Sequence, residues 1–478
     1  MKYLFIVVVL LLLLQGLNAE ITLNQAIEMA TQNNKDLQMA KEDVKIAEYN
    51  YKDVRGQLFP QLSLIGSLKM TKNWLPDKVN QEIPKVSKMI TQPEDGQEDN
   101  YLKNDQIIAG YLDGFIEKQI PSSPTGETSI AGIIQFQQLL FSGGKLINGI
   151  RVLDKVKTMQ EKRYELQMQQ MVLTVVGSFY DLYLAQEGLA IQRQALSTAE
   201  MHLERVENLH RQGLVSEYDK LRAELEVSRL YPEVLNFENM KNLAEENFNR
   251  IIGNTGEVVL NPTLIDKTAN FSSFDITLEK AIESAKEKRV ELYLTNLMQE
   301  IYEVQRRAER DNWMPNLILQ ADITRYNAPS PDFEVKSDDF GTMGSVGLVF
   351  QMPLFSGLSN SSKSLRSRHE LRKSEYENIN ANEMITLEVR QNWQSFYQSL
   401  KYLEIAEKNL ELSMRALNIA EARFENQSGI QLEVFDSQIQ YNGALMAISQ
   451  AKIKIIKDYF ALNKAIGNNL NKIIGDIQ

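Results

Sequence analysis

The sequence of 478 residues contains no cysteine and only three histidines. Without cysteine the chain can form no disulfide, thiolate zinc site or iron–sulfur cluster, and it has no cysteine nucleophile. Lysine and arginine number 52 against 63 aspartates and glutamates, which gives a formal net charge of −11. Because the chain is acidic and has no dense basic run, it lacks the positive surface expected of a nucleic-acid-binding protein. We therefore expect no nucleic-acid partner.

The histidines and glycines form no recognisable enzyme motif. His202 and His210 are eight residues apart, which does not match the i, i+4 spacing of a helical metal-binding pair, and His369 is isolated. Residues 143–145 (Gly-Gly-Lys) lack the preceding glycine and the following Ser or Thr of a phosphate-binding loop. The sequence has no Gly-x-Ser-x-Gly nucleophile motif. We therefore predict no catalytic residue, cofactor or metal, and the chain has no nucleotide site with which to power a process by itself.

The N-terminal segment is typical of a secretory signal peptide. Lys2 precedes an apolar run over residues 4–14, and the small residue Ala19 suits cleavage before Glu20. This run is short for a membrane span, so an uncleaved anchor helix is the less favoured alternative. No later segment approaches the ~18 consecutive apolar residues of a spanning helix. We expect residues 1–19 to be removed on export, and any membrane crossing to use strands.

Short motifs recur along the chain and indicate a tandem duplication. Residues 23–28 (LNQAIE) recur as 278–283 (LEKAIE), and FPQL at 59 recurs as MPNL at 314, both with an offset of 255. LFSG at 140 recurs as LFSG at 354, and NRIIGN at 249 recurs as NKAIGN at 463, both with an offset of 214. The difference, 255 − 214 = 41 residues, indicates one enlarged loop in the first half. The sequence therefore predicts a first repeat at 20–274 and a second repeat at 275–478.

Each repeat contains long runs in which apolar residues step by three and four, the spacing of a heptad seam. The segment 144–210 has no proline and would span roughly 100 Å as a helix. In each half two shorter helices, stacked end to end, would match the length of the long one. The expected helices are 24–58, 144–210 and 216–252 in the first repeat, and 278–314, 357–426 and 430–466 in the second.

Four segments alternate apolar and polar residues, as strands with one apolar face do. They are 60–70, 127–141, 315–327 and 342–355. Each is long enough to cross an outer membrane when tilted, but four strands cannot close, and open edges would leave amides unsatisfied in lipid. Two copies would give 8 strands around a filled interior, and three would give 12 around a lumen. We therefore expect a mainly α-helical homotrimer with a membrane β-barrel portion to which each chain contributes four strands.

Phe59, Phe141, Trp313 and Phe355 lie at the ends of these strands that adjoin the helices. Aromatic residues at this position are typical of the girdle that marks a membrane interface. The alternative is that each is an ordinary packing residue. The loops at the opposite ends, about 71–126 and 328–341, are expected to face outward from the cell.

The sequence resembles the TolC-like outer-membrane efflux protein family over essentially the whole mature chain. The motifs that carry the resemblance are the duplicated LFSG junctions and residues 213–224 and 429–438. The resemblance implies a homotrimer in the outer membrane whose 12-stranded barrel continues into an α-barrel across the periplasm. It further implies a passive exit duct of a tripartite efflux or type I secretion system. The implied partners are outer-membrane lipid, a periplasmic adaptor (membrane fusion protein) and an inner-membrane pump or ABC exporter.

By the same resemblance, acidic residues at the tips of the helical hairpins are candidates for a periplasmic gate. They are Glu433 and Asp436 in the second repeat and Glu217 and Asp219 in the first. Positions 433 and 436 share a helix face, and three-fold repetition would place like charges around a narrow opening. The alternative is that all four are solvated carboxylates that favour helix N-termini. In the second repeat the tip motif begins two residues closer to Gly429 than in typical family members. The alignment of this tip with the family therefore stays open.

A different class of function is a periplasmic coiled-coil adaptor or scaffold without a pore. It would account for the heptad seams, but it leaves the alternating strands and their aromatic ends unexplained. The sequence therefore favours the exit duct.

Overall fold

The computed structural model describes residues 20–71, 108–113, 127–256, 258–262, 265, 271, 274–327, 340–426, 428–470 and 472–473. The expected signal peptide, most of the loop 71–126 and most of the loop 328–341 lie outside these residues. The chain divides into two compact units. A helical unit comprises 1–52, 147–309 and 359–478, and a sheet unit comprises 53–146 and 310–358. Each unit therefore takes segments from both sequence repeats.

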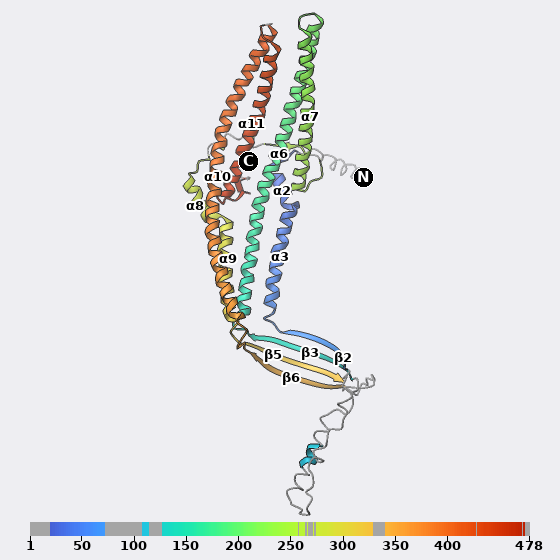
Figure 1. Ribbon diagram of the computed structural model, residues 1–478, viewed down its shortest axis with the longest axis vertical. Helices are drawn as coiled ribbons and strands as arrows, with labels where there is room; N and C mark the ends of the chain where they lie inside the picture. Colours follow the sequence, from blue (N-terminus) through green and yellow to red (C-terminus); the bar gives the residue numbers. More distant parts are fainter. Residues whose placement is uncertain are drawn as a thin grey trace, which may run out of the picture. The chain divides into compact units, whose positions relative to one another are not determined.

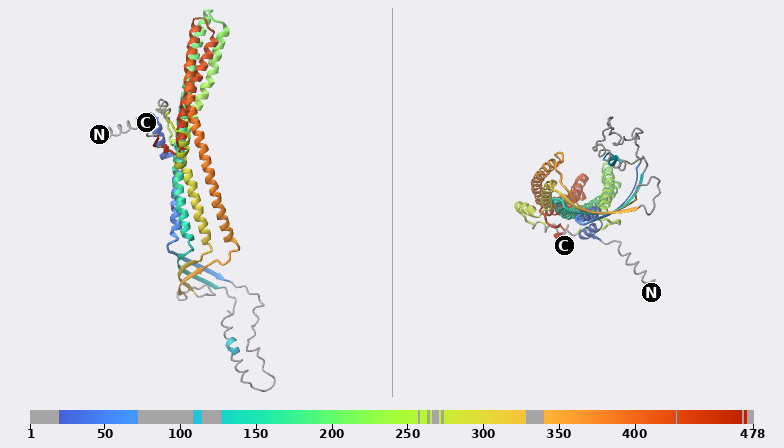
Figure 2. Two further views of the ribbon diagram at one scale, coloured as in Figure 1. Left: turned by 90° about the vertical axis from the view of Figure 1, so that its left-hand side faces the viewer. Right: turned by 90° about the horizontal axis from the view of Figure 1, so that it is seen from below.

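The helical unit contains two long antiparallel hairpins (Figure 1). In the first, α6 (Lys145–Arg211) has 67 residues and returns as α7 (Glu217–Ile252) with 36. In the second, α10 (Ser359–Glu425) also has 67 residues and returns as α11 (Gln431–Ala465) with 35. The two tips lie at the same end of the unit (Figures 1 and 2). Among the described residues, no helix is both long and apolar enough to cross a membrane.

The sequence predicts a single helix at 24–58 and another at 278–314. This prediction is wrong in one respect, because each segment forms two helices. The first is α2 (Leu23–Asn33) followed by α3 (Lys35–Gly56), and the second is α8 (Leu278–Lys288) followed by α9 (Val290–Asp311). Asn34 and Arg289, which are 255 residues apart, separate them with an extended backbone (ψ 125° and 122°). The helices also end before the turns that lead to Pro60 and Pro315.

Hydrogen bonds to the returning helices account for both breaks. The Asn34 side-chain amide donates to the carbonyl of Ile251 in α7 at 3.2 Å. At the equivalent place the Arg289 guanidinium donates to the carbonyl of Ala465 in α11, also at 3.2 Å. These carbonyls are 214 residues apart and belong to the last turns of their helices, where intrahelical partners are missing. Each break therefore caps the C-terminus of a helix that is distant in sequence.

Glycine permits the close approach at both joints. Gly253 and Gly467 have left-handed φ values of 71° and 82° just after α7 and α11. A Cβ at Gly253 would lie 2.4 Å from the Cβ of Asn33, and one at Gly467 would lie 2.6 Å from the Cβ of Lys288. The backbone thus packs directly on the residue before each break, which leaves no room for a side chain.

The core of the helical unit surrounds these joints. Its largest fully buried side chains are aromatic and include Phe179 and Tyr180 of α6, Phe248 of α7, Phe396 of α10 and Phe460 of α11. A short parallel pair, β1 (Ile21–Thr22) and β4 (Leu260–Asn261), borders the core and was not expected from the sequence. The two joints and both hairpins therefore share one hydrophobic core.

The sheet unit is a four-stranded antiparallel sheet in the order β2-β3-β5-β6 (Figure 1). The strands are β2 (Gln61–Thr71), β3 (Glu127–Phe141), β5 (Asn316–Asn327) and β6 (Phe340–Gln351). The expectation that the last strand runs to residue 355 is wrong. Gln351 already pairs with Asn316, the first residue of β5, and Pro353 has no N–H to extend the ladder.

Candidate functional site

The register of the sheet places most of its large apolar side chains on one face. Leu64 pairs with Ile134, Ile134 pairs with Ile323, and neighbouring pairs two residues along each strand continue the pattern. Much of this face is exposed in the chain, since Leu62, Leu64 and Val346 are 74%, 78% and 79% accessible. A contiguous apolar surface of this kind requires a lipid or protein cover. The face consists of Leu62, Leu64, Leu68, Met70, Ile130, Ile134, Phe136, Leu317, Leu319, Ala321, Ile323, Val346, Leu348 and Phe350.

The opposite face of the same sheet carries a band of polar side chains. Across the four strands, Ser63 pairs with Gln135, Gln135 pairs with Asp322, and Asp322 pairs with Ser345. The Ser345 hydroxyl donates to one carboxylate oxygen of Asp322, and the Thr324 hydroxyl donates to the other at 3.4 Å. Alternation along each strand therefore gives the sheet one predominantly apolar face and one mixed face, on which this polar band lies between the apolar pairs Ile65–Ile133 and Ile318–Val349.

The sheet has two open edges among the described residues, since β2 and β6 each pair with one neighbour only. Each edge presents a row of backbone N–H and C=O groups without a partner strand. Such groups cannot face hydrocarbon, so a sheet that enters lipid must pair both edges with further strands.

The four aromatic residues predicted to form an interfacial girdle lie at one end of the sheet. Phe59 precedes β2 and Trp313 precedes β5, whereas Phe141 ends β3 and Phe355 follows β6. Neighbouring strands are antiparallel. The starts of β2 and β5 therefore lie at the same end of the sheet as the ends of β3 and β6. Their accessible fractions are 62%, 42%, 49% and 79% in the order just given.

The tip of the first hairpin is closed by local signals. Gly213 adopts a left-handed φ of 72°, and the N–H of Leu214 donates to the carbonyl of Leu209 at 3.0 Å, which ends α6. Ser216 then caps α7: its hydroxyl accepts from the backbone N–H of Asp219 at 3.2 Å. The Asp219 carboxylate accepts in return from the N–H of Ser216 at 3.1 Å. This reciprocal arrangement is a capping box.

Asp219 is therefore engaged in the fold of the tip, and its Oδ2 also accepts from the Ser216 hydroxyl at 2.6 Å. Glu217, two residues before it, is exposed, and within the described part of the chain it has no ion pair or side-chain hydrogen bond. The two acidic candidates of the first repeat thus differ, because one caps a helix and the other faces solvent.

The second tip lacks the capping box. An offset of 214 places Ile430 at the position of Ser216 and Glu433 at the position of Asp219, and Ile430 has no side chain that can cap α11. The Glu433 carboxylate instead pairs with Arg423 of α10 at 3.2 Å, across the turn. Asp436 is exposed, and the described residues provide it with no ion pair or side-chain hydrogen bond. A charge pair has therefore replaced the local cap.

The two hairpins contact each other near their tips through His202, for which the sequence analysis found no role beyond a rejected metal-ligand spacing. The imidazole lies against Phe424 and Phe435 of the second hairpin, with ring centroids 5.4 and 5.0 Å apart. Nearby, Arg205 of α6 pairs with Glu425 of α10 at 3.2 Å. A cavity of 240 Å³ lies between the four helices here. No local pattern indicates these partners, because they lie more than 200 residues apart in the chain.

Burial lowers the pKa of His202, and the positive charge of Arg205 lowers it further. The neutral imidazole is therefore the form that fits between the two phenyl rings. Among the described residues no group of three or more His, Asp or Glu is placed to hold a metal ion.

The sequence profile of the family described as outer membrane efflux protein matches residues 26–254 and 281–468. No curated protein matches the chain in sequence. Among solved structures, the chain is similar to the outer membrane protein VceC from Vibrio cholerae, with 14% identity and a TM-score of 0.68 over 94% of this chain and 96% of that one. The Campylobacter jejuni CmeC outer membrane channel gives 14% identity and a TM-score of 0.69 over 95% and 89% of the two chains.

The open state of the Neisseria gonorrhoeae MtrE outer membrane channel is also similar, with 15% identity and a TM-score of 0.66 over 94% of this chain and 89% of that one. At such low identity the structures establish the fold, whereas the two profile segments together cover most of the chain and establish the family. This family and its structural neighbours are channels rather than enzymes. The resemblance seen in the sequence is thereby confirmed. The protein is located in the outer membrane and extends into the periplasm, and the chain belongs to the outer membrane efflux protein family.

Proposed function

We propose that three copies of the chain form a passive exit duct through the outer membrane. In this arrangement β6 of one chain pairs with β2 of the next, so that three sheets of four strands close into a barrel of 3 × 4 = 12. The apolar face of each sheet meets lipid and the polar face lines the lumen. The observation that carries this proposal is the combination of a two-faced sheet with two open edges.

The duct depends on other proteins for energy, because the sequence has no nucleotide-binding motif. A periplasmic adaptor (membrane fusion protein) would connect the hairpins of the helical unit to an inner-membrane pump or ABC exporter. Both a tripartite efflux system and a type I secretion system fit this assembly. The proposal therefore specifies an exit route and leaves the choice of pump to experiment.

Within this proposal, Phe59, Phe141, Trp313 and Phe355 form an aromatic girdle at the membrane interface. Their common position at one end of the sheet supports this role. At the hairpin tips, Glu217, Glu433 and Asp436 supply the charges of a periplasmic gate. Asp219 belongs to the gate through its cap on α7, which fixes where the neighbouring Glu217 is held.

A periplasmic scaffold without a pore explains the hairpins equally well. It gives no reason for a sheet whose apolar face is largely exposed and whose edges are unpaired. We therefore retain the duct as the function best supported.

The first experiment is single-channel recording in planar bilayers, combined with mass measurement of the protein purified in detergent. The protein should be the mature chain from Glu20 to Gln478. We expect a trimer that conducts ions and prefers cations. A water-soluble monomer without conductance would overturn the duct and favour the scaffold.

A further inference from the structure

We propose that Arg289 and Glu388 are positioning residues of the second hairpin: they tether α10 to the break between α8 and α9, a restraint that the first repeat lacks. The effect of this tether on the gate rests on the proposed function. The tether itself rests on the contacts around Arg289 and on the comparison of the two repeats.

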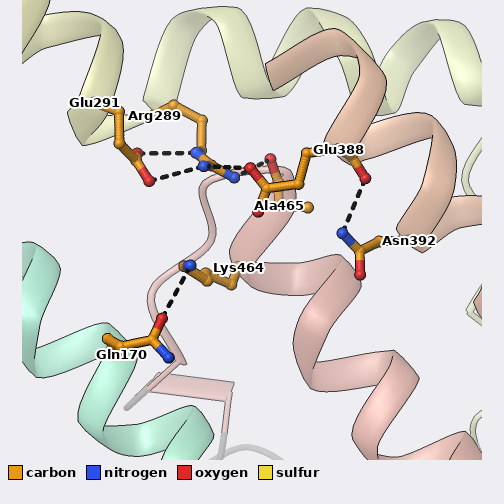
Figure 3. Close-up of polar contacts among 7 residues, drawn as sticks. All are labelled: Gln170, Arg289, Glu291, Glu388, Asn392, Lys464 and Ala465. Carbon is orange, nitrogen blue, oxygen red and sulfur yellow. Dashed lines mark hydrogen bonds and ion pairs between the residues drawn. The ribbon is translucent and has the colours of Figure 1, made fainter. Parts of the chain in front are cut away.

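The guanidinium of Arg289 binds groups on three helices, α9, α10 and α11 (Figure 3). Its side chain is only 5% exposed, and it forms ion pairs at 2.7 Å with Glu291 of α9 and with Glu388 of α10. It also donates to the carbonyl of Ala465 at the end of α11. Arg289 itself stands between α8 and α9. One side chain therefore holds both legs of the second hairpin at the joint.

The carboxylates dominate the electrostatics of this site. Burial alone would lower the pKa of Arg289, but the hydrogen bonds and charges of Glu388 and Glu291 raise it above its ordinary value. A planar guanidinium with two carboxylate partners is a strongly oriented arrangement. Removal of either carboxylate leaves the largely buried guanidinium with less compensating charge, but only removal of Glu388 also breaks the bond between Arg289 and α10.

In the part of the first repeat that the structure describes, the same joint is present without the tether. Asn34, the equivalent of Arg289, also donates to the last turn of the returning helix, at Ile251. The position equivalent to Glu388 is 388 − 214 = 174, which is a threonine. The Thr174 hydroxyl donates to the carbonyl of Gln170 within α6. The donor and the carboxylate of the second repeat therefore replace a neutral pair that makes no bond between the break and the long helix.

Because the tether lies far from the second tip, a small rotation at the joint produces a large displacement of that tip. Glu388 lies 425 − 388 = 37 residues before the end of α10, an arm of roughly 56 Å at about 1.5 Å per residue. A rotation of about 3° at the joint would move the end of such an arm by about 3 Å. At the same level Lys464 of α11 donates to Gln170 of α6 at 3.2 Å, so that the joint also contacts the first hairpin (Figure 3). The joint therefore sets the angle at which α10 and α11 run toward their tip, which carries Glu433.

The two carboxylates provide a matched pair of variants. Glu291 accepts from Arg289 at 2.7 and 2.9 Å and Glu388 accepts at 2.7 Å, but only Glu388 belongs to α10. The chain has no cysteine, so spin labels can be placed on introduced cysteines without a background. A label pair at Met201→Cys in α6 and Ile419→Cys in α10, both exposed, measures the separation of the two hairpins. A pair at Met201→Cys and Leu225→Cys, within the first hairpin, is the internal control.

We expect Glu388→Gln to shift or broaden the distance distribution between hairpins by a few Å, and to leave the distance within the first hairpin unchanged. Glu291→Gln should leave both distances as in the unmodified chain. Glu388→Asp, which keeps the charge but shortens the side chain, should give an intermediate result and serves if the Gln variant does not fold. Equal shifts in the Glu291→Gln and Glu388→Gln variants, or no shift in any variant, would overturn the tether.

Bilayer recording of the same proteins separates this inference from the proposed function. A higher resting conductance in Glu388→Gln than in Glu291→Gln would support both. A distance shift in proteins that never conduct would support the tether and contradict the duct. A conducting channel with unchanged distances in Glu388→Gln and Glu388→Asp would contradict the tether alone.

Discussion

Replacement of Ser216 by alanine tests how the first hairpin tip is held. The variant removes the hydroxyl that accepts from the Asp219 N–H at 3.2 Å and donates to its carboxylate at 2.6 Å. Loss of an N-cap hydroxyl costs about 1 kcal/mol, and about 1.4 kcal/mol corresponds to a tenfold change in an equilibrium constant. We therefore expect the first turn of α7 to open about fivefold more often.

The second repeat offers the reverse experiment. Ile430→Ser places a hydroxyl at the equivalent N-cap, three residues before Glu433, and so creates the Ser-x-x-Glu pattern of a capping box. We expect the first turn of α11 to be stabilised by about 1 kcal/mol, and therefore to open about fivefold less often. The ion pair between Glu433 and Arg423, which this change would disturb, is about half exposed and contributes less than about 1 kcal/mol.

Hydrogen–deuterium exchange followed by mass spectrometry measures both effects in the intact protein, because peptides near residues 210–224 and 424–438 report each tip separately. Ser216→Thr, which keeps a capping hydroxyl, is the control and should exchange like the unmodified chain. Unchanged exchange in Ser216→Ala, or faster exchange in both tips, would refute the assignment of Asp219 to a local capping box.

Three further predictions concern the gate, the contact between the hairpins and the membrane interface. Asp436→Asn should reduce the cation preference of single channels more than Glu433→Gln, because Arg423 already compensates the charge of Glu433; equal effects in bilayer recordings would contradict this. Burial lowers the pKa of His202 in the folded protein. The neutral imidazole therefore stabilises the contact above the unfolded-state pKa of about 6.5, and this contribution is lost as the pH falls toward the lower folded-state pKa. Deuterium exchange at the contact between the hairpins should therefore rise, after correction for intrinsic rates, between pH 7.5 and 5.5 in the unmodified chain but much less in His202→Phe, which keeps an aromatic ring. Finally, brominated lipids should quench the tryptophan fluorescence of a variant that retains only Trp313. A variant that retains only Trp393 should keep its fluorescence, because this side chain donates to the carbonyl of Ile276 in the helical unit at 2.8 Å.

Local pattern and internal repetition were sufficient to predict the long helices, the hairpins and the four strands. The break at Arg289 was not predictable in this way, whereas Asn34 is a local N-cap signal that was not recognised, since its side-chain oxygen accepts from the N–H of Leu37 at 3.1 Å. Each break is fixed by a bond to a carbonyl 217 or 176 residues away in the sequence. The Ser216 cap is a local signal that the sequence contains, whereas the pairing of Glu433 with Arg423 depends on the turn that brings α10 and α11 together. Contacts between residues of the same helix or strand could therefore be predicted from the sequence, whereas contacts between different elements could not.

The two repeats stabilise equivalent places with different chemistry, and this difference affects how each hairpin responds to change. In the first repeat the tip is closed by the capping box of Ser216 and the joint by the neutral Asn34. In the second, ion pairs of Glu433 and Arg289 occupy both places. A capping box joins the side chains and backbone of a single helical turn, whereas an ion pair between helices depends on where each helix lies and weakens with ionic strength. The turn of the first tip is therefore closed by its own sequence, while the direction of the second hairpin depends on residues as distant as Glu388, so a substitution far from the second tip can move it without disturbing a single helical turn.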